Sequence, residues 1–262
     1  MRPTLKTSSI LLAAVLALPI TNAARTTIPR IGIADRQSHS IPAVRASRLV
    51  KGFVVDDRLS VLRRGADVRS QIVQRLRLGR PVYILGSGSA SPDQPKCYRV
   101  AVTRRTRGWI HNSAIVIPGR AGDDARLLRL AETAEDGLDR IALCLLLTDR
   151  FRSSSLVSKA LLLMAAEAER VAPILSQRAA KRAATLDPRT ADARLRDYYL
   201  NDAVLDRYSR LGVAFDFDEA AGQYVYDGGA YRVIIKRYPA SEAAKIAHER
   251  LKIVEQQLAR CK

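Results

Sequence analysis

The chain has 262 residues, 47% of them apolar, so it is long enough to bury one large core or two small ones. That apolar fraction excludes a wholly disordered chain. The formal net charge of +18 favours an anionic binding partner.

The first 24 residues have the three parts of a secretory signal. Arg2 and Lys6 form a basic start, residues 10–18 are apolar, and small residues lead up to Ala24. The apolar stretch is too short to span a bilayer, which needs about 20 residues, and no later stretch reaches that length. We therefore expect a signal peptide over 1–24, an exported protein, periplasmic or extracellular, and no membrane span. The alternative is a buried N-terminal helix.

Basic charge is concentrated in one half of the chain. Residues 25–118 hold 18 Lys and Arg against 5 Asp and Glu, whereas residues 119–262 hold 24 against 21. The asymmetry indicates that the first half binds something anionic. For an exported protein this is a cell-wall polymer or another anionic component of the envelope. A nucleic acid fits the charge alone and is the rival partner.

The chain then passes from a linker to a strand-rich segment. Residues 25–49 mix Pro, Ser and Arg without periodicity and are typical of a linker. Residues 50–118 contain short β-branched runs separated by Gly, Pro and Ser, which predict a small antiparallel barrel. The Gly- and Ser-rich residues 86–95 are expected to form a loop. The predicted strand runs are 53–55, 59–62, 72–76, 81–85, 98–102, 108–110 and 114–118.

Several of these segments resemble a known family. Gly108-Trp109-Ile110, which follows the basic hairpin turn 103–107, resembles the closing strands of the bacterial SH3 domain. Residues 59–65 and 72–85 resemble that family's first two strands. The resemblance implies a small SH3-like β-barrel that binds a ligand and does not catalyse. The departures from the family pattern are Ser60 and Leu62, which replace Asn and Arg, and Ala66, which replaces Pro.

The hairpin supplies the candidate ligand-binding residues. Arginine forks suit phosphate or carboxylate groups, and an aromatic face can stack on a sugar or a peptide. The alternative is that the tryptophan closes the core of the barrel and the arginines form a solvated turn. The candidates are Tyr98, Arg104, Arg105, Arg107 and Trp109.

From residue 119 onward the pattern is helical. Gly122-Asp123 predicts a helix start, and one apolar stripe continues from Leu127 to Leu145. Pro173 is expected to kink the second helix or to open a further one. The remaining prediction comprises helices over 156–170, up to about 184, from Asp187-Pro188 to about 211, over 224–237 and over 241–260, with a loop over 215–222.

A short pattern occurs twice in this half. Phe151 with Ser154, and Tyr238 with Ser241, each place an aromatic residue after one helix and a Ser cap before the next. The second copy, residues 231–247, resembles the hairpin of tetratricopeptide-type repeats. We expect residues 119–262 to form an all-α domain, either a helical bundle or a tetratricopeptide-like repeat, that binds a protein partner.

No motif for catalysis or metal binding was found in the sequence. His39, His111 and His248 lie in no nucleophile motif, and Cys144 lies among leucines of a predicted helix. The acidic residues of 216–219 lack the Gly and Glu of a calcium loop. We expect no catalytic residue, no metal and no cofactor. A disulfide between Cys144 and Cys261 is left open.

Together these features predict an α+β protein of two domains, a barrel over 50–118 and a helical domain over 119–262. The predicted function is non-catalytic binding or scaffolding at the bacterial cell envelope. The alternatives are a basic nucleic-acid-binding protein, an accessory of a cell-wall hydrolase, or an enzyme without a recognised motif.

Overall fold

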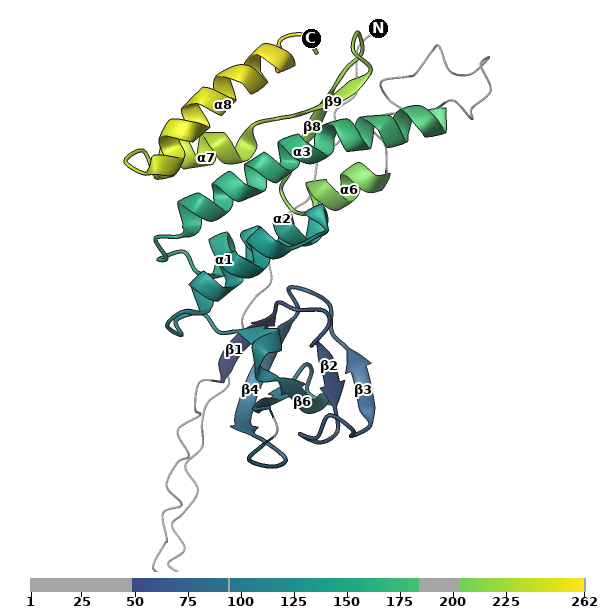
Figure 1. Cartoon of the computed structure of the whole chain (residues 1–262), viewed down its shortest axis with the longest axis vertical. Coiled ribbons are helices and arrows are strands. Elements are labelled where there is room, and N and C mark those ends of the chain that lie inside the picture. Colours follow the sequence, from purple (N-terminus) through teal and green to yellow (C-terminus); the bar gives the residue numbers. More distant parts are fainter. Residues whose placement is uncertain (1–48, 94, 184–202, 262) are drawn as a thin grey trace, which may run out of the picture. The chain divides into compact units, whose positions relative to one another are not determined.

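A computed structural model describes residues 49–93, 95–183 and 203–261 (Figure 1). A seven-stranded antiparallel sheet is followed by a largely helical region, so the predicted α+β class is confirmed. The predicted signal peptide and nearly all of the predicted linker lie outside the described residues. So does most of the helix predicted to start at Asp187.

The strands lie close to where the apolar runs predicted them. Neighbouring strands follow the order β3-β2-β6-β5-β4-β1-β7, and every pair is antiparallel. Strand β4 continues through residues 86–88, which the sequence predicted as loop. The strands are β1 (Val50–Val54), β2 (Val61–Arg63), β3 (Ile72–Arg75), β4 (Pro81–Gly88), β5 (Cys97–Ala101), β6 (Arg107–His111) and β7 (Ile115–Val116).

The prediction of a small SH3-like barrel is wrong, because the sheet does not close. Among the described residues β3 pairs only with β2, and β7 pairs only with β1. The physical reason lies at β7, which has two residues and so offers little edge for pairing. Side chains of the following helix, and not β3, form hydrogen bonds with the backbone of β7 and of the residue after it.

The sheet has its own apolar core on one face. Val54, Leu62, Val82, Val100 and Ile110 meet there, almost completely buried. A glycine allows the two halves of the sheet to approach each other. A Cβ atom on Gly108 would lie 2.5 Å from the carbonyl oxygen of Arg63. A side chain at position 108 would therefore push β6 away from β2.

The helices correct the sequence prediction at one break. The stripe from Leu127 to Leu145 predicted one helix, but it is divided between α1 (Asp123–Thr133) and α2 (Gly137–Arg150). Asp136 causes the break, because its carboxylate accepts hydrogen bonds from the N–H groups of Leu138 and Asp139 and starts a new helix. The other helices are α3 (Val157–Ala183), which continues through Pro173, α6 (Ala203–Ser209), α7 (Gly229–Arg237) and α8 (Glu242–Leu258).

The prediction that residues 119–262 form an all-α domain is wrong, because this half contains a β-hairpin. Strands β8 (Phe215–Asp218) and β9 (Gln223–Tyr226) form an antiparallel pair where a loop and the start of a helix were predicted. The rings of Phe217 and Tyr224 lie edge to face with centroids 5.6 Å apart, and both are buried. Burial of these aromatic rings against α3 favours strands here, although the sequence predicted that a helix begins at Tyr224.

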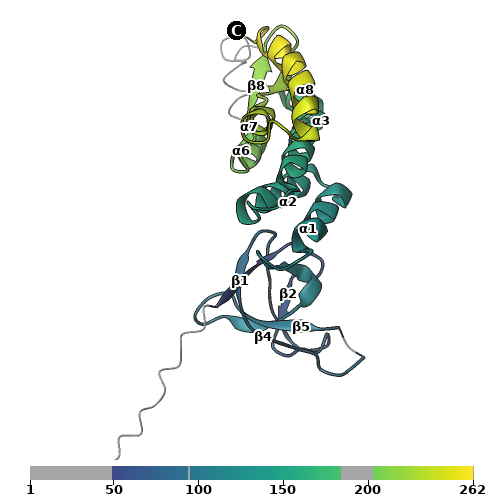
Figure 2. The ribbon, with the colours of Figure 1, turned by 90° about the vertical axis from the view of Figure 1, so that its left-hand side faces the viewer.

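The two copies of the Ser motif adopt the same turn. The N–H of Ser154 donates to the carbonyl oxygen of Phe151 at 2.8 Å, and that of Ser241 donates to Tyr238 at 3.0 Å. The hydroxyl of Ser154 also accepts a bond from the N–H of Leu156, just before α3, and that of Ser241 accepts one from Ala244 in the first turn of α8. The turns therefore join α2 to α3 and α7 to α8 alike, and α8 lies along α3 (Figure 2).

The end of the sheet is continuous with the helical core. Phe53, Val55 and Val116 are buried in the same cluster as residues of α1 and α2. The guanidinium of Arg150 lies 5.0 Å from the centre of the Phe53 ring. Cys144 is buried in this core as a free thiol, so the disulfide with Cys261 is not formed.

Candidate functional site

The structure separates the five predicted ligand-binding residues between the two faces of the sheet and the tip of the β5–β6 hairpin. Tyr98 pairs across the hairpin with Ile110, and Trp109 pairs with Arg99. Residues directly opposite each other on antiparallel strands share a face, and neighbouring residues alternate. Because Ile110 belongs to the buried core, Tyr98 lies on the core side, whereas Trp109 lies on the opposite side.

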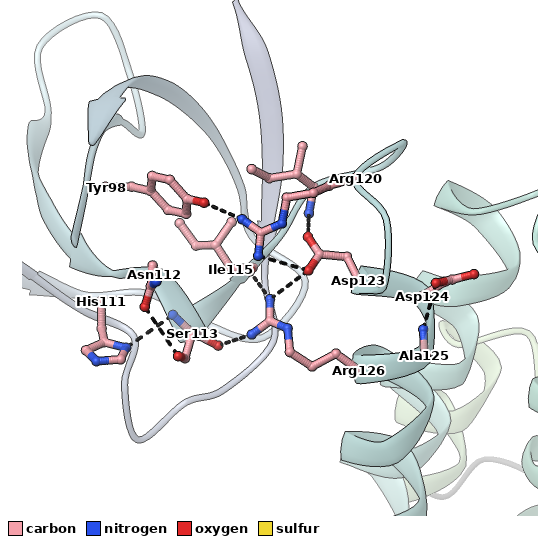
Figure 3. A network of polar contacts seen from close by, with 11 residues as sticks. Tyr98, His111, Asn112, Ser113, Ile115, Arg120, Asp123, Asp124, Ala125 and Arg126 are labelled. Atoms are coloured by element: carbon pink, nitrogen blue, oxygen red, sulfur yellow. Dashed lines mark hydrogen bonds and ion pairs between the residues drawn. The ribbon is translucent and has the colours of Figure 1, made fainter. Parts of the chain in front are cut away.

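Tyr98 belongs to the contact between the sheet and α1. Its ring packs at the margin of the sheet core, and its hydroxyl accepts a hydrogen bond from the guanidinium of Arg120 (Figure 3). The same guanidinium bonds Asp123, the first residue of α1. Tyr98 is therefore held in a structural network and does not lie beside Trp109.

Arg104 and Arg105 lie at the tip of the hairpin between β5 and β6. The hydroxyl of Thr103 accepts hydrogen bonds from the N–H groups of Arg105 at 3.3 Å and Thr106 at 3.0 Å, which closes the turn. Both arginine side chains are exposed. They extend the basic surface beyond the sheet without a fixed partner among the described residues.

The side of the sheet opposite its core, which we call the outer face, carries two rows of residues across the strands. The first row contains Arg63, Trp109, Arg99 and Gly86 on β2, β6, β5 and β4. The second row contains Arg107, Ala101, Tyr83 and Lys51 on β6, β5, β4 and β1. The outer face therefore combines two aromatic rings with four cations.

Trp109 lies at the centre of the outer face. A Cβ atom built on Gly88 of β4 would be 3.4 Å from two atoms at the far end of the indole, so the ring extends across β5 toward β4. The absence of a side chain at position 88 leaves room for the ring. Trp109 remains half-buried, and Arg63 and Arg99 flank it on the neighbouring strands.

Residues next to Trp109 are held by hydrogen bonds. Arg63 donates a hydrogen bond at 2.9 Å to the carbonyl oxygen of Ser70 in the loop before β3. Cys97 is buried on β5, where burial raises the pKa of its thiol and the charge of Arg63 opposes the rise in part. Its neighbour across the hairpin, His111, accepts a bond from the N–H of Ser113 through Nδ1. The raised pKa of Cys97 disfavours the thiolate form, which is the nucleophilic one.

The cations of the sheet are not neutralised. Residues 49–118 contain 13 Lys and Arg against 4 Asp and Glu. Within the described part of the chain every salt bridge involves residues from Arg120 onward. Arg99, Arg104, Arg105 and Arg107 therefore keep their full charge toward solvent, which concentrates anionic ligands near the outer face.

An acidic hollow lies where the sheet meets the helices. Its floor contains Val55, Leu78 and Leu143, and its rim carries five carboxylates. Burial, and then the nearby charges of Asp136 and Asp57, raise the pKa of Asp139. These acidic residues come from the loop after β1 and from the junction of α1 and α2, and none of them is on the strands of the outer face. The rim carboxylates are Asp56, Asp57, Glu135, Asp136 and Asp139.

Sequence reasoning missed four members of the outer face, namely Lys51, Arg63, Tyr83 and Arg99. The strand alternation around Trp109 could have identified Arg99, because a five-residue hairpin turn fixes which residues oppose each other. Lys51, Arg63 and Tyr83 come from strands whose register relative to β6 depends on long-range pairing.

The outer face carries groups that can bind a ligand. Guanidinium groups can hold phosphate or carboxylate, and an open indole ring can stack on a sugar or a base. In residues 49–93, 95–183 and 203–261, no group of three or more His, Cys, Asp and Glu side chains is placed to hold a metal ion. No helix in this part of the chain is long and apolar enough to cross a membrane.

Comparison with known proteins gave no match to a family model, a curated protein or a solved structure.

Proposed function

We propose that this chain is a non-catalytic binding protein of the bacterial cell envelope, whose outer face binds an anionic wall polymer. The observation that carries the proposal is Trp109 held between Arg63 and Arg99 in one row across the sheet. A repeating polymer with sugar rings and anionic groups matches alternating aromatic and cationic contacts. The signal-like residues 1–24 support an exported location.

Affinity on such a surface comes from several contacts acting together. A single exposed charge contact contributes only up to about 1 kcal/mol. Arg63, Arg99, Arg107 and Lys51 lie on neighbouring strands and can engage successive groups of one polymer chain. The exposed Arg104 and Arg105 lengthen the track at the end of the hairpin.

We further propose that the helical part binds a protein partner. The surface between α3 and α8 is hollowed and has Leu162, Tyr231 and Ile246 in its lining. Glu169 accepts hydrogen bonds from Tyr231 and Arg250 and fixes the wall of this hollow. A protein with two such surfaces can connect the wall to another envelope protein.

The test is co-sedimentation of the chain from Arg25 onward with insoluble peptidoglycan sacculi over a range of salt concentrations. Replacing both Arg99 and Arg107 by Gln is expected to lower the apparent affinity roughly tenfold, because two exposed charge contacts are lost. The matched control is Arg210→Gln with Arg237→Gln, which removes the same charge from exposed positions of the helical part.

Two outcomes would contradict the proposal. Equal loss in both double variants would show that total charge, and not the outer face, determines binding. A parallel titration uses a single-stranded DNA oligonucleotide. Tighter binding to the oligonucleotide than to sacculi, with a steep dependence on salt, would overturn the envelope assignment in favour of a nucleic-acid-binding protein.

A further inference from the structure

The two edges of the seven-stranded sheet are treated differently. At β7 the guanidinium of Arg126 donates to the carbonyl oxygens of Ser113, at 2.7 Å, and of Ile115 (Figure 3). Asp123 accepts a bond from the N–H of Ile117 at 2.7 Å. Side chains from α1 thus occupy the backbone groups that another strand would need, and this edge is closed to pairing.

The opposite edge, strand β3, has no such cover among the described residues. It pairs with β2 alone, and its apolar side chains are exposed, Ile72 to 48% and Val73 to 40%. Val68, in the loop just before it, is exposed to 51%. Natural edge strands are commonly protected by short length, charged side chains, Pro or a covering element, and of these β3 has its short length and Arg75. Ile72 and Val73 nevertheless remain exposed on this edge and can contact an added strand.

The backbone of β3 has hydrogen-bonding groups that point away from the sheet. The N–H of Leu76 donates to the carbonyl oxygen of Ser60 at 2.9 Å, so residue 76 faces the sheet. Backbone groups alternate in direction along a strand, and the N–H and carbonyl of Arg75 consequently face the free side. An added strand could pair there without breaking any bond to β2.

The charge around this edge selects among the strands that could pair with it. Five arginines lie in or beside β2 and β3, and Asp67 is the one acid in the same stretch of sequence from 61 to 77. Pairing of two β3 edges would bring two basic clusters together, which disfavours a second copy of this chain. An acidic strand is favoured instead. The arginines are Arg63, Arg64, Arg69, Arg75 and Arg77.

We propose that β3 binds an extended segment of another protein, acidic and apolar in alternation, which adds to the sheet as an eighth strand. Backbone pairing with Arg75 and its neighbours supplies affinity, and Ile72 and Val73 offer apolar contacts. The carboxylates of the segment face the arginine cluster. This interaction uses the backbone edge of β3, whereas the polymer is proposed to bind the side chains of the outer face; Arg63 and Ile72, which oppose each other, lie next to both.

The test is fluorescence anisotropy of a labelled synthetic peptide that alternates Glu and Val, titrated with the chain from Arg25 onward. We expect binding that falls at least tenfold when alternate backbone amides of the peptide are N-methylated, because a methylated amide cannot donate. A Lys–Val peptide is expected not to bind. Equal binding of the methylated peptide would overturn the proposal and indicate charge attraction alone.

Variants of the protein locate the interaction. Ile72→Thr with Val73→Thr removes the apolar contacts but keeps β-branched residues, and is expected to weaken binding about tenfold. Val50→Thr with Leu85→Thr, exposed positions on β1 and β4, is the matched control and should leave it unchanged. The Arg99→Gln, Arg107→Gln variant should also bind the peptide normally. Loss of peptide binding in that variant would place the peptide on the outer face and refute its pairing with β3.

Discussion

The carboxylate of Asp123 accepts a hydrogen bond from the backbone N–H of Ile117 at 2.7 Å. Asp123 is the first residue of α1 and Ile117 directly follows β7, so one side chain joins the end of the sheet to the start of the helices. The residue is only 2% exposed, and Arg120 and Arg126 lie 3.1 and 3.4 Å from the carboxylate. Its charge is paired and also lies at a helix N-terminus, where negative charge is favoured.

Replacing Asp123 by Ala is therefore expected to destabilise the protein by about 3 kcal/mol, the scale for breaking a buried charged pair. The change leaves Arg120 and Arg126 without their carboxylate partner and the N–H of Ile117 without an acceptor. Urea unfolding followed by circular dichroism measures the loss. Asp93→Ala, in the exposed loop after β4, is the control and should have little effect. A loss as small as that of the control would show that the contact is dispensable.

Gly108 is expected to be intolerant of any side chain. A Cβ atom there would lie 2.5 Å from the carbonyl oxygen of Arg63 and 2.8 Å from the Leu62 side chain. Gly108→Ala should cost about 1–3 kcal/mol, as overpacking does in other cores. Gly86→Ala is the matched change within the same sheet, because a Cβ atom at position 86 meets nothing within 4 Å. Thermal unfolding of both variants measures the difference, and similar melting temperatures would contradict the argument.

The positions of most elements could be predicted from the sequence, but the closure of the sheet could not. Local periodicity and turn residues locate strands such as β5 and β6, whose pairing is set by the short turn between them. Closure would have required β3 to pair with β7, a contact between residues far apart in sequence. Asp123 and Arg126 bond the backbone at and beside β7 instead, which no pattern in the strands reveals.

The hairpin β8–β9 was missed for a different reason. Phe215-Asp-Phe217-Asp and Tyr224-Val-Tyr226 alternate with a period of two, which is a strand signal. The acidic residues between the rings favour a loop, but the burial of Phe217, Tyr224 and Tyr226 decides the structure. At the candidate site the same period places Tyr98 with the buried Val100, on the face away from Trp109.

A second buried carboxylate, Glu167 on α3, connects three helices. It accepts a hydrogen bond from Arg140 of α2 and bonds from Arg170 at 2.6 and 2.9 Å. Arg140 also donates to the carbonyl oxygens of Ala131 and Ala134 at the end of α1. Burial acts to raise the pKa of Glu167, but the bonds from Arg170 and Arg140 outweigh it and hold the pKa below its ordinary value.

This lowered pKa predicts how stability depends on pH. A carboxyl whose pKa is lower in the folded than in the unfolded protein stabilises the fold above its unfolded pKa, and that contribution is lost as the pH falls toward the folded pKa. Glu167→Gln should therefore cost about 2 kcal/mol at neutral pH, the scale of charged hydrogen bonds. The difference from the wild type should shrink as the pH falls below the ordinary value of 4.5. Urea unfolding at several pH values measures both curves, with Glu249→Gln on the exposed side of α8 as the control. A difference that stays constant down to acid pH would show that Glu167 acts by its shape and not by its charge.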